Sequence, residues 1–251
     1  MNTTLTAATI TGSLVVAVLL GAWLRRLLPE HHLSGDTKDT VKLAMGLVAT
    51  MSALVLGLLV SSAKGSYDTT RTQVIQMAAK AAFFDRILAL YGPESAEARS
   101  QLRAAVEEAV KHMWPEEKGL PVRLAPNPQP GDAVYNALAR LSPGDDEHRS
   151  LKNQAMNVAA DLGQLRALLL AESVASISKP LLVVVVCWLV VIFFSFSLLA
   201  PPNATALMAL FVSALSVAGA CFLILELDRP FGGLIQISSE PMLNALRQLA
   251  K

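Results

Sequence analysis

Small and polar side chains recur along one apolar block of the sequence at the spacing of a helical face. Gly46, Thr50, Ala53, Gly57 and Ser61 follow one another at intervals of three or four residues. On a helix, such intervals place side chains on the same side. In lipid, a stripe of small residues lets helix backbones approach closely. In an oligomer, a partly polar stripe can instead line a water-filled pore.

The sequence leaves both interpretations of this stripe open and favours close packing. The apolar residues beside it, Leu54 and Leu58, belong to the pore interpretation, because rings of apolar side chains gate some channels by excluding water. The candidate residues for pore lining or helix packing are Gly46, Thr50, Ala53, Leu54, Gly57, Leu58 and Ser61.

Ionisable residues at the ends of apolar blocks form a second group of candidates. Glu226, Asp228 and Arg229 end the last block, at a depth where acidic groups are costly unless they are paired or hydrated. We expect Asp228 and Arg229 to be solvated or paired at the membrane interface. Glu226 lies about one helical turn deeper than Arg229. We therefore expect it to pair with a cation on a neighbouring helix, either Lys64 or Lys179.

The sequence contains no recognisable catalytic or cofactor-binding motif. Its four histidines lie outside the apolar blocks, and H-E-x-x-H, G-x-S-x-G and the phosphate-binding G-x-x-x-x-G-K-[ST] do not occur. We therefore predict no enzyme activity, no cofactor and no metal site. Lys and Arg number 21 against 20 Asp and Glu, and this balance gives no reason to expect binding to nucleic acid.

Four apolar blocks must position the candidate residues. The blocks cover residues 7–28, 41–63, 180–200 and 204–227. Each is long enough for the roughly 20 apolar residues that a membrane-spanning helix needs. The first block could be a signal peptide, but it lacks a basic n-region and an A-x-A cleavage site. The sequence therefore predicts an integral, multi-pass membrane protein whose first partner is the lipid bilayer.

The spans form two pairs, within residues 1–63 and 180–227, and residues 64–179 between them are predicted to be a soluble helical domain. Residues 66–91 contain no Gly or Pro, and their apolar residues recur at helical spacing. Only Lys64 and Gly65 separate this run from the second span, so the helix can continue out of the membrane. The predicted fold class is all-α, with the helical domain inserted between the second and third spans.

Proline and turn residues divide the rest of the soluble domain. Gly92 and Pro93 stop the first helix, and five prolines predict an extended loop at 115–130. Further helices are expected at about 94–114, 132–141 and 146–178, and residues 228–251 form a C-terminal segment. Within the first helix, Asp85 and its neighbour Arg86 are expected to belong to a helix-surface or inter-subunit ion pair.

Four spans place both termini and the soluble domain on one side of the membrane. Basic residues near the span ends are more numerous on that side than on the other, and such an excess marks the cytoplasmic side. The sequence thus predicts an inner (plasma) membrane protein with cytoplasmic termini and a cytoplasmic helical domain.

Three segments together resemble the bestrophin-like membrane proteins, a family of unassigned function. They are LGLLVSSAKGSYD at 56–68, FDRILALYGPESAEAR at 84–99 and ELDRPFGGLIQIS at 226–238. The resemblance covers nearly the whole chain. The residues that carry the family motifs are Asp85, Arg86, Tyr91, Gly92, Pro93, Pro230, Phe231 and Gly232.

That family is distantly similar to bestrophins, which are pentameric anion channels with the second span around the pore. The resemblance implies a bestrophin-like fold and a cyclic homo-oligomer, with a pentamer as the family's form, that passes inorganic ions. Two departures matter. Gly233 and Leu234 replace the acidic cluster of calcium-sensitive bestrophins, which argues against a calcium site. Met51, Leu54, Val55 and Leu58 replace the aromatic neck.

Two functions stay open from the sequence. The first is an oligomeric ion channel whose pore is lined by the second span, and the family resemblance implies that the ions are anions. The second is a non-conducting membrane scaffold or sensor whose soluble helical domain binds a partner.

Overall fold

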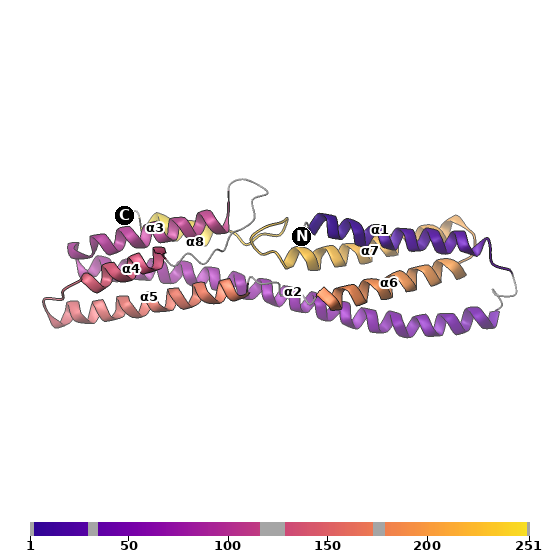
Figure 1. Ribbon diagram of the computed structural model, residues 1–251, viewed down its shortest axis with the longest axis horizontal. Helices are drawn as coiled ribbons and strands as arrows, with labels where there is room; N and C mark the ends of the chain where they lie inside the picture. Colours follow the sequence, from indigo (N-terminus) through magenta and orange to yellow (C-terminus); the bar gives the residue numbers. More distant parts are fainter. Residues whose placement is uncertain (1–2, 30–34, 116–128, 173–178, 250–251) are drawn as a thin grey trace. The chain divides into compact units, whose positions relative to one another are not determined.

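The computed structural model describes residues 3–29, 35–115, 129–172 and 179–249, and these residues form helices without any strand (Figure 1). The elements are α1 (Thr3–Arg25), α2 (Gly35–Tyr91), a short 3-10 helix (Pro93–Ser95), α3 (Ala96–Met113), α4 (Gln129–Arg140), α5 (Asp146–Glu172), α6 (Lys179–Leu199), α7 (Ala204–Leu227) and α8 (Glu240–Gln248). The chain divides into two compact units, Met1–Ser66 with Ser176–Asp228 and Tyr67–Ala175 with Arg229–Lys251. The all-α prediction is therefore confirmed.

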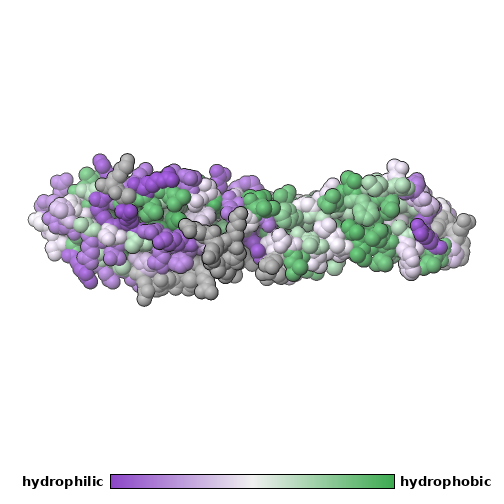
Figure 2. All heavy atoms as spheres, turned by 90° about the horizontal axis from the view of Figure 1, so that it is seen from above, coloured by the Kyte–Doolittle hydropathy of each residue, from purple (hydrophilic) through white to green (hydrophobic). Residues whose placement is uncertain are grey.

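The first unit holds four helices that are long and apolar enough to cross a membrane. They are α1, the apolar part of α2, α6 from Pro180 onward, and α7. The visible surface of this unit is largely hydrophobic, whereas that of the second unit is largely hydrophilic (Figure 2). α1 ends at Arg25, before the predicted limit of the first block at residue 28. The residues after Arg25 form turns. Pro29 follows them, and a proline disfavours helical backbone geometry in the residue before it.

α1 packs against both α6 and α7 at the centre of the first unit. Leu14 and Val18 of α1 are fully buried there. The Ser197 hydroxyl of α6 donates a hydrogen bond of 2.6 Å to the carbonyl oxygen of Val18. At Gly21, an added Cβ atom would lie 2.6 Å from the carbonyl oxygen of Phe194. The α1–α6 contact therefore depends on a small residue and an interhelical hydrogen bond, which stabilise helix packing in lipid.

α2 is one continuous helix of 57 residues, and Lys64 and Gly65 do not interrupt it. This confirms the prediction that the second span continues into the following helix. In the first unit, Leu59 and Ala63 of α2 join the apolar cluster that α1, α6 and α7 form. In the second unit, the C-terminal part of α2 contributes a regular series of buried residues, including Phe84 and Leu88.

The second unit is a bundle around one hydrophobic core. Its core residues come from α2, α3, α4, α5 and α8 and from the segments next to them, which contribute Leu141, Phe231, Ile237 and Leu249. Residues 116–128 of the predicted proline-rich loop lie outside the described residues, as do residues 173–178 of the predicted last helix. α3, α4 and α5 match three predicted helices with shifted ends.

α8 was not predicted from the sequence. Its buried residues Met242 and Ala245, with Leu249 after it, pack into the core of the second unit, and Pro241 occupies its first turn, where proline is tolerated. A helix of nine residues gives too short an apolar series to stand out. The C-terminal segment is therefore partly structured by packing, because so short a helix is marginal by itself.

The close approach at Gly21 leads to a first testable prediction. We expect Gly21→Ala to lower the stability of the detergent-solubilised protein by about 1–3 kcal/mol, because the new methyl group has no room against the α6 backbone. The measurement is the midpoint of thermal unfolding. Gly12→Ala is the matched control, since an added Cβ at Gly12 of the same helix meets nothing within 4 Å. An equal effect of both substitutions would contradict the prediction.

Candidate functional site

The seven candidate residues of α2 all lie on exposed parts of the helix. Gly46, Thr50, Ala53, Leu54, Gly57, Leu58 and Ser61 are each exposed in the single chain. The residues that α2 buries in the first unit are others, namely Ser52, Leu59 and Ala63. The side of α2 that carries the candidates is thus turned away from the apolar cluster of its own chain. We call the seven residues the α2 face.

The α2 face is smooth and mostly apolar. An added Cβ at Gly46 or Gly57 would meet nothing within 4 Å. The Thr50 hydroxyl donates to the carbonyl oxygen of Gly46 within the helix at 2.9 Å, so this polar group has a partner without water. Leu54 and Leu58 are 68% and 62% exposed. Large apolar side chains with that exposure mark a surface that lipid or another protein chain covers.

The charged residues predicted at the membrane interface differ in burial. Glu226 is only 3% exposed, whereas Lys64 and Arg229 are exposed and Asp228 is half-buried at the C-terminal end of α7. Lys179 begins α6, but its side chain lies outside the described residues. The pairing of Glu226 with Lys64 or Lys179 therefore stays a prediction. Glu226 is therefore the most buried of the charged residues in this group whose burial the structure describes.

The motif Pro230-Phe231-Gly232 forms a fixed turn after α7. The Ile237 amide donates to the carbonyl oxygen of Pro230 at 2.8 Å, and the Gly232 amide donates to that of Arg229 at 3.1 Å. The Phe231 ring meets the Trp114 ring edge to face, with centroids 5.5 Å apart. The Trp114 indole N–H donates to the carbonyl oxygen of Ile237 at 2.8 Å. The motif thus attaches the C-terminal segment to the end of α3.

Asp85 forms an ion pair with Arg99 and not with its neighbour Arg86. The Arg99 guanidinium donates from Nε to Oδ1 of Asp85 at 2.7 Å and from Nη2 to Oδ2 at 3.1 Å. These hydrogen bonds raise the pKa of Arg99 further above its usual range. Arg86 is exposed. The ion pair expected for Asp85 is thus formed with Arg99 of the same chain. Arg86 does not share it, because adjacent residues of a helix point in different directions.

The motif Tyr91-Gly92-Pro93 ends α2. Gly92 has φ 105°, in the left-handed region that favours glycine. Pro93 then begins the 3-10 helix. The hydroxyl of the fully buried Ser95 lies 2.5 Å from the carbonyl oxygen of Leu88 and 2.7 Å from that of Gly92. The carbonyl groups left free at the end of a helix thereby find a partner in the next turn.

Tyr91 is a structural residue of this turn. Its ring meets the His148 ring edge to face at 5.0 Å. Burial raises the pKa of the Tyr91 phenol, and the negative charges of Glu94 and Asp145 raise it further. Asp145 also hydrogen-bonds His148 at 2.7 Å, which raises the pKa of His148. The Tyr91 phenol is therefore neutral at physiological pH and acts through packing.

Sequence reasoning did not find the partners of the motif residues. Asp85 is paired with Arg99. The Phe231 ring contacts Trp114, and the Tyr91 ring contacts His148. Each partner lies on another segment of the chain, so spacing along one helix gives no signal for it. A weak signal was present for Arg99, because it is the only cation in the first turn of α3.

Comparison with known proteins identifies relatives of the fold. The family model described as the bestrophin-like domain matches residues 12–242. A crystal structure of a bacterial bestrophin homologue from Klebsiella pneumoniae with a single mutation has 16% sequence identity and a TM-score of 0.67, covering 96% of this chain and 98% of that chain. A second mutant of this homologue has 13% identity and a TM-score of 0.64, covering 94% and 97%. No curated protein sequence matched the chain.

The Asp85–Arg99 pair generates a second prediction. We expect Asp85→Asn to destabilise the protein by roughly 1.5–3 kcal/mol, because Asp85 is only 12% exposed and its two charge-assisted hydrogen bonds are lost or weakened. The thermal unfolding midpoint should fall by roughly 2–4 °C per kcal/mol. Asp161→Asn is the matched control. Asp161 pairs with Lys80 at 2.5 Å but is 52% exposed, so we expect less than about 1 kcal/mol. Equal losses would show that burial does not set the strength of the Asp85 pair.

Proposed function

Because the chain belongs to the bestrophin-like family, we propose that it is an oligomeric membrane channel for inorganic anions, with α2 around the pore. The four apolar helices and the family together indicate an integral membrane protein. In the proposed assembly the copies form a closed ring, as cyclic homo-oligomers do, and a pentamer is the form that the resemblance implies. The termini and the helical unit face the cytoplasm.

The observation that supports this proposal is the low burial of α2 in the first unit. Within the most apolar stretch of each span, 11% of the residues are buried in α2, against 28% in α1 and 33% in α6. The share in α7 is 22%, so α2 is the span with the fewest residues buried within its own chain. In a ring of copies, its free side can meet the α2 of neighbours and the central axis.

The chemistry of the α2 face fits an anion path. It carries no acidic side chain, and of its two hydroxyl groups that of Thr50 already donates to the carbonyl oxygen of Gly46. Leu54 and Leu58 are exposed and large enough to form apolar rings, which close a narrow pore by excluding water. Leu54 and Leu58 are the proposed gate, and Thr50, Gly57 and Ser61 are the proposed lining.

Ion flux from liposomes tests the proposed pore. We expect Thr50→Trp to reduce chloride flux several-fold by narrowing the pore, and Leu54→Ala to increase it by weakening the apolar barrier. Val212→Trp on α7 is the matched control, because Val212 is also exposed in the chain, at 61%, and lies on a span outside the proposed pore.

Images of the purified particles complete this test. The proposal expects a symmetric ring with α2 innermost. Flux that responds to neither substitution would remove Thr50 and Leu54 from the pore. A symmetric ring without flux in any variant would favour the scaffold or sensor function, and a monomer without an axial cavity would contradict both the pore and the ring.

A further inference from the structure

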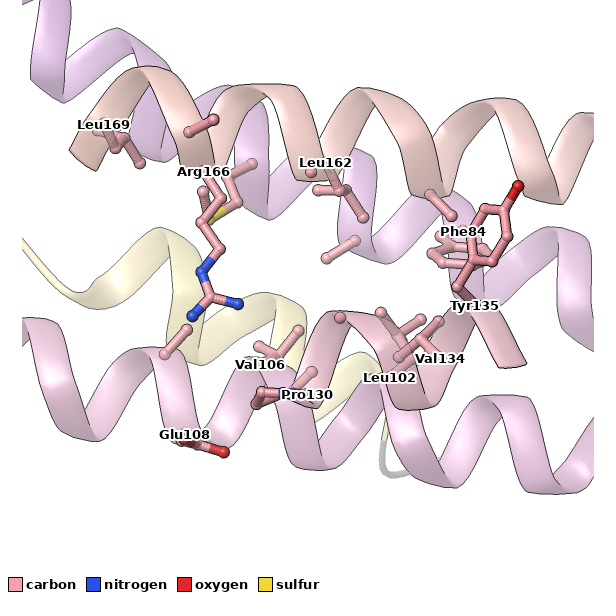
Figure 3. A pocket seen from close by; sticks show the side chains of 18 of the residues that line it. Phe84, Leu102, Val106, Glu108, Pro130, Val134, Tyr135, Leu162, Arg166 and Leu169 are labelled. Carbon is pink, nitrogen blue, oxygen red and sulfur yellow. The ribbon is translucent and has the colours of Figure 1, made fainter. Parts of the chain in front are cut away.

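Two pockets of the protein differ in the charges around them. The cavity of the second unit, about 630 Å³, is mostly apolar and is bordered by Arg166 as well as by the acids Glu108 and Asp132 (Figure 3). Its mixed charges favour neither an anion nor a cation. A pocket of about 360 Å³ in the first unit is different, because the charged residues that line it in the described part of the chain are all cations.

This cationic pocket lies where helices of the first unit end or begin. Arg25 is the last residue of α1, and Lys38 and Lys42 lie near the start of α2. Phe196 and Leu199 come from the last turn of α6. All of these residues belong to one compact unit. The three helix ends therefore meet at one end of the unit, where a hydrophilic patch interrupts the largely hydrophobic surface (Figure 2).

The charge of Arg25 is not neutralised within the described part of the chain. Its guanidinium atom Nη1 is buried and has no hydrogen-bond partner there. A buried donor without a partner is costly, and a charged one is more costly than a neutral one. An anion in the pocket would lower this cost by compensating the charge of the guanidinium group.

The two lysines of the pocket are also available to an anion. Lys42 lies 3.3 Å from Asp39, from Nζ to Oδ1, but the two side chains are 62% and 74% exposed. Exposed pairs of this kind contribute little, so an anion can compete with Asp39 for Lys42. Asp36 and Asp39 are both exposed and do not line the pocket. The charges of the lining therefore favour an anionic ligand.

We propose that the cationic pocket binds a phosphate group, and that an anionic phospholipid of the bilayer supplies it. The ends of membrane spans lie at the level of the lipid head groups. A guanidinium group such as that of Arg25 matches phosphate geometrically, and Lys38 and Lys42 add compact positive charges. Phe196 and Leu199, next to these cations, offer apolar surface to the carbon atoms of the lipid. Basic pockets between spans are known to suit anionic head groups.

The lining selects an anionic lipid over a zwitterionic one. Phosphatidylcholine and phosphatidylethanolamine carry a positive charge beside the phosphate, and no acidic residue is among the described residues of the lining that could receive it. Phosphatidylglycerol carries the phosphate charge alone. The proposal rests on insertion of the four spans into a bilayer, and it does not require ion conduction.

The proposed orientation of the protein makes these cations unusual. It places this end of the spans on the non-cytoplasmic side, where Lys and Arg are less frequent. Three cations around one pocket there need a reason other than membrane topology. A bound anionic head group supplies that reason, because it neutralises cations that otherwise oppose the proposed orientation.

Native mass spectrometry of the full-length protein tests the lipid preference. The purified protein in detergent is titrated with phosphatidylglycerol or with phosphatidylcholine of the same acyl chains, and the lipid-bound peaks give apparent dissociation constants. We expect phosphatidylglycerol to bind at least about tenfold more tightly. Inorganic phosphate is the third probe, compared by the shift of the thermal unfolding midpoint. We expect phosphatidylglycerol to raise this midpoint and inorganic phosphate to leave it unchanged, because free phosphate lacks the apolar contacts.

A matched pair of variants tests the role of Arg25. We expect Arg25→Gln to weaken phosphatidylglycerol binding about tenfold, as loss of a charge-assisted hydrogen bond does, and to leave phosphatidylcholine binding unchanged. Arg26→Gln removes the same charge from the next residue, which is exposed and does not line the pocket, and should change the affinity less than about twofold. Arg25→Lys should retain part of the affinity. Unchanged phosphatidylcholine binding also shows that each variant is folded.

Four results would overturn the proposal. Equal affinity for the two lipids would remove the preference for an anionic head group, and equal losses in Arg25→Gln and Arg26→Gln would reduce it to general charge attraction. Equal stabilisation by inorganic phosphate would assign the pocket to a free anion. A changed oligomer mass in Arg25→Gln with unchanged phosphatidylglycerol affinity would assign it to a contact between copies. Lipid binding is measured without ion flux, so failure of this proposal and failure of the channel proposal are distinguishable.

Discussion

One uninterrupted helix, α2, contributes to both compact units and must suit two different surroundings. A helix satisfies its own backbone hydrogen bonds, which any segment in hydrocarbon requires. Between Val74 and Leu88, α2 buries a regular series of apolar side chains in the core of the second unit, because water makes that burial favourable. Between Gly46 and Ser61, most side chains stay exposed in the single chain. In lipid, burying an apolar side chain against another helix gains little hydrophobic free energy. The two burial patterns therefore follow from the two surroundings.

The features that the sequence predicted well are those set by local composition. Membrane spans can be recognised because a run of about 20 apolar residues without charges is typical of a membrane-spanning helix. The end of α2 was predictable since Gly92 and Pro93 both oppose continued helix, and Gly92 does adopt a positive φ of 105°. The family resemblance was also confirmed, because it depends on short motifs in order along the chain. None of these predictions requires knowledge of which residues meet in space.

The contacts that give the site its geometry were harder to predict. Asp85 and Arg99 are 14 residues apart, and Trp114 and Ile237 are 123 apart, so no helical spacing relates them. The small-residue stripe shows the same limit within one helix. Its spacing predicted that Thr50 and Gly57 share a face, but Ser52 and Ala63 are also small and lie on the buried side. Residue size alone therefore could not identify which side of α2 packs against its own chain.

Under the proposed channel function, the composition of the α2 face limits how ions can be selected. The face carries hydroxyl groups at Thr50 and Ser61 but no charged side chain, and the Thr50 hydroxyl is already bonded to Gly46. Such a surface replaces little of an ion's hydration shell. Selection at Leu54 and Leu58 would then depend on how readily an ion gives up water, since an apolar constriction offers no ligand in exchange. Large, weakly hydrated anions should accordingly pass more easily than small, strongly hydrated ones. That order would distinguish a leucine constriction from a ring of fixed positive charges, which attracts anions by charge.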